Sequence, residues 1–244
     1  MRAIMIGTIV AAASLAAGAD ETSSQVRAAA TCGQGSVFIL KSLVAIEMRG
    51  QEQEVKIETP AVVLDGSGLM VAPNPEELFG NLPQGANLAA KSFRLILAEG
   101  REVEAKVVGR DADFGLLFLR LDGKEGPAPA PVAVVHKDAL QLGDPLFLLR
   151  RLSSAHPEPI CQESRVTSVV QKPRLMYMVS DSPGPCSVAL TPAGELVGLT
   201  VVVKEQDAES GRKNQLMVVL PIAQVQEAAK GIREEPPAPE APGK

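Results

Sequence analysis

Residues 60–73 read PAVVLDGSGLMVAP, two apolar runs joined by the sequence DGSG at residues 65–68. β-Branched and aliphatic residues favour strands, and a short turn of Asp, Gly and Ser between two such runs predicts an antiparallel hairpin. The segment FRLILAEGREVEAKVVG, from Phe93, repeats the arrangement with Glu99-Gly100 at the turn. The run FGLLFLRLDG, from Phe114, is almost entirely apolar, as expected of a strand buried on both faces. The first half of the chain therefore predicts an antiparallel sheet.

The second half contains more strand-like segments and ends in a predicted helix. Its apolar runs are PLFLLRRL, SRVTSVVQ, LMYMVSD, GELVGLTVVV and QLMVVLP, all between residues 145 and 221. Alternating prolines over residues 124–131 predict an extended connector. After Pro221, the residues Ile222, Val225, Ala229 and Ile232 recur at helical spacing. The predicted fold class is all-β, with antiparallel β-barrels over residues 35–123 and 132–233 and a C-terminal helix; a plain β-sandwich is the alternative.

The N-terminal sequence is typical of a secretory signal peptide. Arg2 precedes an apolar run over residues 3–16, and Ala-Gly-Ala at residues 17–19 is a small-residue cleavage site. The apolar run is short for a bilayer-spanning helix. We therefore expect cleavage of residues 1–19, a secreted or periplasmic mature chain without an integral membrane span, and a flexible leader over residues 20–34. The Pro-rich acidic residues 234–244 predict a disordered tail.

Charge and cysteine content restrict the partners. The net charge is −5 and no long basic cluster occurs, so nucleic acid is not an expected partner. The cysteines are Cys32, Cys161 and Cys186, and they form no CxxC or Cys/His cluster. No zinc site, other metal site or cofactor is expected. An oxidising compartment would permit one disulfide and leave one thiol unpaired.

The order of these segments resembles a known family. PAVVLDGSGLMVAPNP, LAEGREVEAKVVGRDADFGLLFLRLDG, LQLGDPLFLL, RVTSVV and PGPCSVALTPAGELVGL are together similar to the protease domain of the HtrA class of trypsin-like serine endopeptidases. The resemblance covers approximately residues 42–229, without a following PDZ module. It implies a trypsin-like double barrel with a cleft between the barrels, where the family carries a histidine, an aspartate and a serine.

Matching the family's motifs places these three positions at Pro75, Gly115 and Cys186. Pro75 follows Asn74 in a sequence typical of a helix start, so the short helix is expected to remain although the base is lost. Gly115 has no side chain that could orient a base. The nearby Asp111 and Asp113 are interpreted as solvated turn residues.

Cys186 would need a neighbouring base to become a reactive thiolate. His136 and His156 match no catalytic position. The resemblance also implies that the backbone N–H groups of Gly184 and Cys186 form an oxyanion-type site. In the family fold the loop before RVTSVV lies beside the nucleophile loop, which favours a Cys161–Cys186 disulfide. Pairing of Cys186 with Cys32, or a free buried thiol, are the alternatives.

These substitutions predict a secreted pseudo-protease that lacks an intact triad and binds a peptide or protein ligand. The alternative is an active endopeptidase with a rearranged site, in which Cys186 or Ser187 is the nucleophile. The two hypotheses differ in whether a base reaches the thiol.

Overall fold

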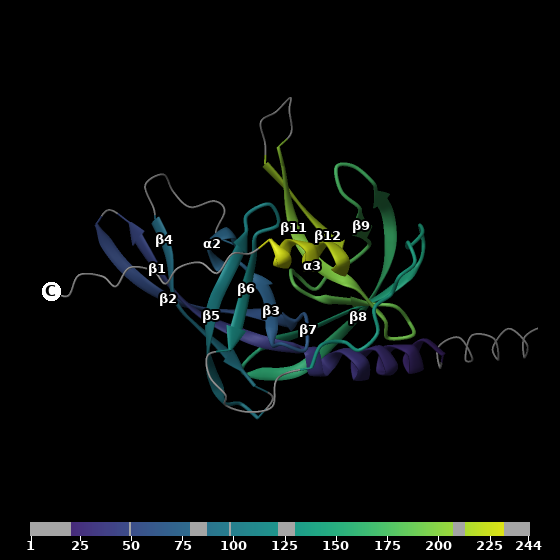
Figure 1. The fold of residues 1–244 in the computed structure, drawn as a ribbon, viewed down its shortest axis with the longest axis horizontal. Coiled ribbons are helices and arrows are strands. Elements are labelled where there is room, and N and C mark those ends of the chain that lie inside the picture. Colours follow the sequence, from purple (N-terminus) through teal and green to yellow (C-terminus); the bar gives the residue numbers. More distant parts are fainter. Residues whose placement is uncertain are drawn as a thin grey trace, which may run out of the picture.

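The computed structural model describes residues 21–48, 50–78, 87–97, 99–121, 130–206 and 213–231. Within them, strands form two closed antiparallel barrels that lie side by side (Figure 1). The strand order is β1-β2-β3-β6-β5-β4 in the N-terminal barrel and β10-β11-β12-β9-β8-β7 in the C-terminal barrel. The predicted double barrel is therefore confirmed, and the β-sandwich alternative is wrong.

The N-terminal barrel is built from the predicted hairpins. Its elements are β1 (Val37–Met48), β2 (Gln51–Val63), β3 (Leu69–Pro73), α2 (Pro75–Leu78), β4 (Asn87–Ile96), β5 (Glu102–Asp111) and β6 (Leu116–Leu121). The DGSG turn forms as expected, because the Asp65 carboxylate accepts the Ser67 N–H at 2.8 Å and Val63 pairs with Met70. β2 begins earlier than the apolar pattern indicates, since a polar stretch from Gln51 pairs with the end of β1.

The C-terminal barrel comprises β7 (Pro145–Ser153), β8 (His156–Val170), β9 (Met176–Val179), β10 (Val188–Leu190), β11 (Leu196–Gln206) and β12 (Lys213–Pro221). It ends in α3 (Ile222–Lys230), which packs against β11 and β12. Ile222 and Val225 are buried, which confirms the terminal helix, whereas Ile232 lies outside the described residues.

Alternation along each strand divides the core into three clusters, one inside each barrel and one shared between the barrels. In β6, Leu117 and Leu119 point into the N-terminal barrel, whereas Leu116 and Phe118 belong to a cluster shared with the C-terminal barrel. In β7, Phe147 belongs to the same shared cluster. Each fully buried side chain of this size contributes roughly 1.5–3 kcal/mol. The continuous apolar run predicted from Phe114 is thus explained by burial on both faces.

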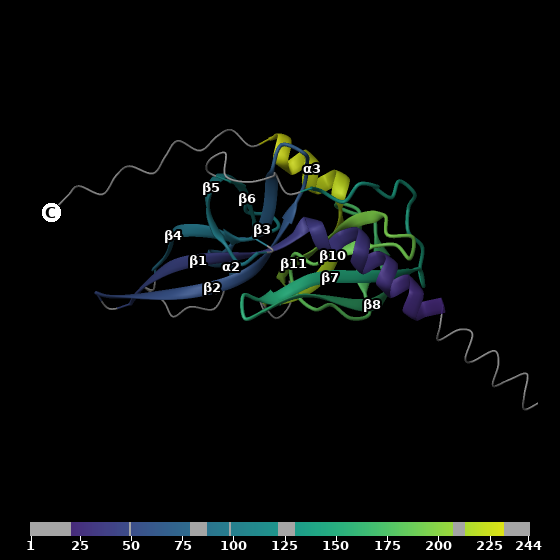
Figure 2. The same ribbon diagram turned by 90° about the horizontal axis from the view of Figure 1, so that it is seen from below.

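An N-terminal helix over residues 21–33 replaces the expected flexible leader. Ala29 on this helix is fully buried, and Val26 and Ala30 pack against the shared cluster. Gly33 faces Leu149 of β7 so closely that an added Cβ would lie 2.6 Å from the leucine Cδ2. Figure 2 shows this helix along the side of the C-terminal barrel, beside β7 and β10. The prediction of a flexible leader is wrong because the small residues give this helix a face that fits closely against the barrel.

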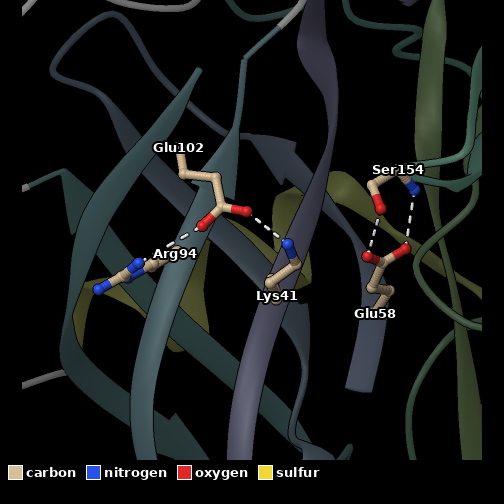
Figure 3. Close-up of polar contacts among 5 residues, drawn as sticks. All are labelled: Lys41, Glu58, Arg94, Glu102 and Ser154. Carbon is tan, nitrogen blue, oxygen red and sulfur yellow. Dashed lines mark hydrogen bonds and ion pairs between the residues drawn. The ribbon is translucent and has the colours of Figure 1, made fainter. Parts of the chain in front are cut away.

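Polar contacts also join the barrels. The Glu58 carboxylate of β2 accepts the Ser154 N–H at 2.7 Å and the Ser154 hydroxyl, at the turn between β7 and β8 (Figure 3). On the outer face of the N-terminal barrel, Glu102 pairs with Lys41 and lies 3.5 Å from Arg94 (Figure 3). The hydrogen bond from Lys41 lowers the pKa of Glu102 below its usual range.

The signal peptide at residues 1–19, connector residues 124–129 and the tail at residues 234–244 lie outside the described residues. Their assignments stay predictions. In the described part of the chain, no helix is long and apolar enough to cross a membrane.

Candidate functional site

A cavity of about 70 Å³ lies where the barrels meet. The N-terminal barrel lines it with α2 and the turn between β5 and β6, and the C-terminal barrel with the Cys186 loop, β11 and β12. The residues that line the cavity include Asn74, Glu77, Asp113, Phe114, Gly115, Pro185, Cys186, Thr200, Val201 and Gln215. Gly115 and Cys186 therefore face one cavity, and Pro75 lies between two of its lining residues. The structure thus places Gly115 and Cys186 at the same cavity, and Pro75 directly after the lining residue Asn74.

Pro75 is buried at the start of α2. The Asn74 carboxamide oxygen accepts the Glu76 N–H at 3.2 Å, and the Asn74 carbonyl accepts the Glu77 N–H at 3.0 Å. This is the N-terminal capping arrangement expected from the sequence. α2 thus keeps its helical turn, with a proline at the position matched to the family's histidine.

Gly115 is held in the left-handed region, with φ +59°. Its carbonyl accepts the Asn74 N–H at 2.7 Å, which ties the β5–β6 turn to α2. A Cβ added at Gly115 would lie 3.3 Å from the Glu77 Cβ. A side chain larger than hydrogen would be strained there and crowded by Glu77.

Asp113 is a cavity residue that the sequence does not reveal as one. As expected, Asp113 is a solvated turn residue, with its side chain 69% exposed; it also lines the cavity next to Phe114. The Arg174 guanidinium contacts the Asp113 carboxylate at 2.9 Å. Its signal in the sequence is its place directly before the apolar run from Phe114, a run that is buried between the barrels.

The Cys186 thiol is buried and has φ +54°, an uncommon value for a residue other than glycine. Burial raises the pKa of this thiol far above its usual range, and the positive charge of Arg150 offsets only part of that effect. Because the thiolate is the nucleophilic form, a raised pKa lowers the fraction of nucleophilic thiolate at neutral pH.

The two N–H groups expected to form an oxyanion-type site already have acceptors. The Cys186 N–H donates to the Thr200 carbonyl at 2.6 Å, and the Gly184 N–H donates to the Ser182 hydroxyl oxygen at 3.3 Å. An oxyanion site requires N–H groups that point at the reacting atom. In this conformation the N–H groups of Gly184 and Cys186 are engaged in hydrogen bonds within the protein instead.

A buried hydroxyl network fixes the loop in that conformation. The Gly184 carbonyl accepts the Thr200 hydroxyl at 2.6 Å and the Ser187 hydroxyl at 2.8 Å. The Ser187 N–H in turn donates to the Thr200 hydroxyl oxygen at 2.8 Å. Arg150 also donates to the Pro183 carbonyl. Both the hydroxyl and the N–H of Ser187 are therefore used in hydrogen bonds that hold the loop against β11.

Neither histidine lines the cavity. The His136 Nδ1 lies 2.7 Å from the Glu195 carboxylate, at the turn between β10 and β11. His156 is exposed at the start of β8. Within the described residues, no group of three or more His, Cys, Asp or Glu side chains is placed to hold a metal ion.

The cysteines are not paired. Cys32, Cys161 and Cys186 are all free thiols, so the expected Cys161–Cys186 disulfide is not formed. Cys161 is half-buried on β8 and packs against the same shared cluster as Cys186. Membership of the same cluster does not by itself give the Cβ–Cβ geometry that a disulfide needs.

Comparison with known proteins supports the fold alone. No family model matches the chain, and no curated protein matches its sequence. Among solved structures, the chain is similar to the HtrA-type protease AlgW, determined with a tripeptide, at a TM-score of 0.55 and 16% sequence identity. The match covers 84% of this chain and 62% of that protein. The fold is therefore the trypsin-like double barrel found in HtrA-type proteases.

Proposed function

We propose that this chain is a secreted pseudo-protease that binds an extended peptide at the cavity between its barrels. The observation that carries the proposal is the state of Cys186: a buried thiol whose pKa is raised, in a loop whose N–H groups donate internally. Removing members of a catalytic triad leaves only the small acceleration due to binding and the oxyanion hole. Among the described residues that line the cavity, no histidine faces the thiol, and the donors at Gly184 and Cys186 are engaged.

The cavity's lining supports a peptide ligand. Its lining combines the apolar residues Val201 and Pro185 with the polar residues Asn74 and Gln215. Apolar sites with a few polar groups are typical of ligand pockets. The solved AlgW structure was determined with a tripeptide, which makes a short extended peptide the first ligand class to test. Secretion rests on the N-terminal sequence alone.

The test combines a protease assay with thiol labelling of the protein lacking residues 1–19. Unfolded casein and iodoacetamide are added to the wild type and to Cys186→Ala. We expect no cleavage by either protein, and alkylation of Cys186 only after denaturation. The exposed Cys32 is the internal control, because it should be alkylated in the native state.

Cleavage of casein by the wild type that disappears in Cys186→Ala would reject the proposal in favour of an active cysteine-type endopeptidase. Cleavage that persists in Cys186→Ala and disappears in Ser187→Ala would reject it in favour of a serine nucleophile.

A further inference from the structure

A guanidinium group contacts two residues that line the cavity, Asp113 and Phe114. Arg174, in the segment between β8 and β9, reaches across to the N-terminal barrel. Its Nη2 lies 2.9 Å from the Asp113 carboxylate, and its Cζ lies 5.1 Å from the centre of the Phe114 ring. A carboxylate beside an aromatic face is a receptor for a planar cation, since both groups favour a guanidinium.

Asp113 and Phe114 are held in a rigid part of the structure. Phe114 is only 8% exposed and belongs to the shared cluster between the barrels. The Asp111 carboxylate accepts the N–H groups of Asp113 at 2.9 Å and of Phe114 at 3.1 Å. These contacts fix the turn that presents both groups before any ligand arrives.

The Arg174 side chain, in contrast, is held only by weak contacts. The side chain of Arg174 is 49% exposed and that of Asp113 is 69% exposed. Exposed ion pairs and exposed cation–π contacts are individually weak. A second guanidinium could therefore replace Arg174 without disturbing the core.

We propose that Asp113 and Phe114 form a recognition site for an arginine of the bound peptide, and that Arg174 occupies this site in the free protein. The inference rests on the proposed peptide-binding function. The peptide's arginine stacks on Phe114 and pairs with Asp113, and a neighbouring small apolar side chain enters the cavity beside Val201. Glu77 adds a second acidic group to the same lining.

The charge of the whole chain favours such a ligand. The net charge is −5, so a basic peptide is attracted at long range and its association is accelerated at low salt. The internal competitor reduces the apparent affinity, because a peptide must displace Arg174 before its own arginine can bind.

The test measures binding of fluorescein-labelled Ala-Ala-Arg-Val-Ala-Ala by fluorescence anisotropy. Ala-Ala-Gln-Val-Ala-Ala is the neutral comparison peptide. The proteins are the wild type, Arg174→Gln, Asp113→Asn and the control Arg165→Gln, an exposed β8 arginine paired with Glu163 at 3.2 Å. Thermal unfolding of each variant verifies that it is folded.

We expect Arg174→Gln to bind the arginine peptide about three- to tenfold more tightly than the wild type, because the ion pair and the cation–π interaction of Arg174 are both weak. Its affinity for the glutamine peptide should be unchanged. Asp113→Asn should lose the preference for arginine over glutamine, and Arg165→Gln should behave as the wild type.

Failure of the inference differs from failure of the proposed function. If both peptides bind the wild type equally and Arg174→Gln gains nothing, the arginine site is refuted although peptide binding stands. If Arg165→Gln gained as much affinity for the arginine peptide as Arg174→Gln, the effect would come from the overall charge of the protein, and the arginine site would also be refuted. If neither peptide binds any variant, both proposals are refuted.

Discussion

Replacing Thr200 by valine tests whether the hydroxyl network holds the Cys186 loop in place. Thr200 is fully buried on β11, and valine has nearly the same shape without the hydroxyl. The substitution removes the acceptor of the Ser187 N–H and one donor to the Gly184 carbonyl. The Gly184 carbonyl keeps the Ser187 hydroxyl as a partner, whereas the Ser187 N–H is left without its acceptor.

The expected loss can be worked out from these two bonds. A buried donor left unsatisfied costs about 1–3 kcal/mol, and the hydrogen bond to Gly184 adds about 1 kcal/mol. Thr200→Val should therefore lower the free energy of unfolding by about 2–4 kcal/mol. For a chain of 244 residues, this corresponds to a decrease in Tm of roughly 4–16 °C.

Denaturant unfolding followed by far-ultraviolet circular dichroism measures the effect, since the chain has no tryptophan for fluorescence. Thr167→Val is the matched control, because Thr167 is exposed on β8 of the same barrel and should change stability by less than about 0.5 kcal/mol. A difference between the two variants below about 1 kcal/mol would show that the network does not hold the loop.

Three further predictions address packing and charge. In Gly198→Ala the new Cβ would lie 2.0 Å from the Leu220 carbonyl oxygen, so the free energy of unfolding should fall by at least about 2 kcal/mol; an unchanged denaturation midpoint would contradict this. Ala29→Leu should overpack the buried face of the N-terminal helix and speed amide hydrogen exchange there, and unchanged exchange would refute the docking. Lys41 lowers the pKa of Glu102. The ion pair therefore stabilises the fold above the pKa that Glu102 has in the unfolded chain, and this stabilisation is lost as the pH falls through the pKa of Glu102 in the folded protein. The stability difference between wild type and Glu102→Gln should therefore decline below about pH 4.5 and vanish once the folded carboxylate is protonated, and a difference that persists in stronger acid would exclude the ion pair as its source.

Local sequence patterns predict most of the strands correctly because their causes are local. The turn at residues 65–68 and the Gly100 turn each combine a residue suited to positive φ with flanking apolar runs. The polar start of β2 at Gln51 gives no such signal, since it pairs along an exposed hairpin where no burial imposes a pattern. The N-terminal helix gives none either, because its stability comes from packing against distant strands.

The sequence predicts the short helix beside the candidate site, but not the hydrogen-bond partners of the Cys186 loop or the contact between Asp113 and Arg174. The capping signal at Asn74 identified α2, because a helix start depends on neighbouring residues alone. The partners of the Cys186 loop could not be read from the loop, since Thr200 lies 13 residues from Ser187 and meets it only through the β10–β11 pairing. The contact between Asp113 and Arg174 joins residues 61 positions apart, which no local pattern indicates.

The docked N-terminal helix has a consequence for the order in which the chain folds. Its last turn leads to Gln34, whose carbonyl accepts the Arg151 guanidinium 117 positions later in the sequence. Contacts this distant in sequence form late and slow folding. The helix therefore cannot complete its docking until the C-terminal barrel, which supplies Leu149 and Arg151, has been synthesised. Until then the apolar face formed by Val26, Ala29 and Ala30 lacks the barrel surface that covers it in the folded protein.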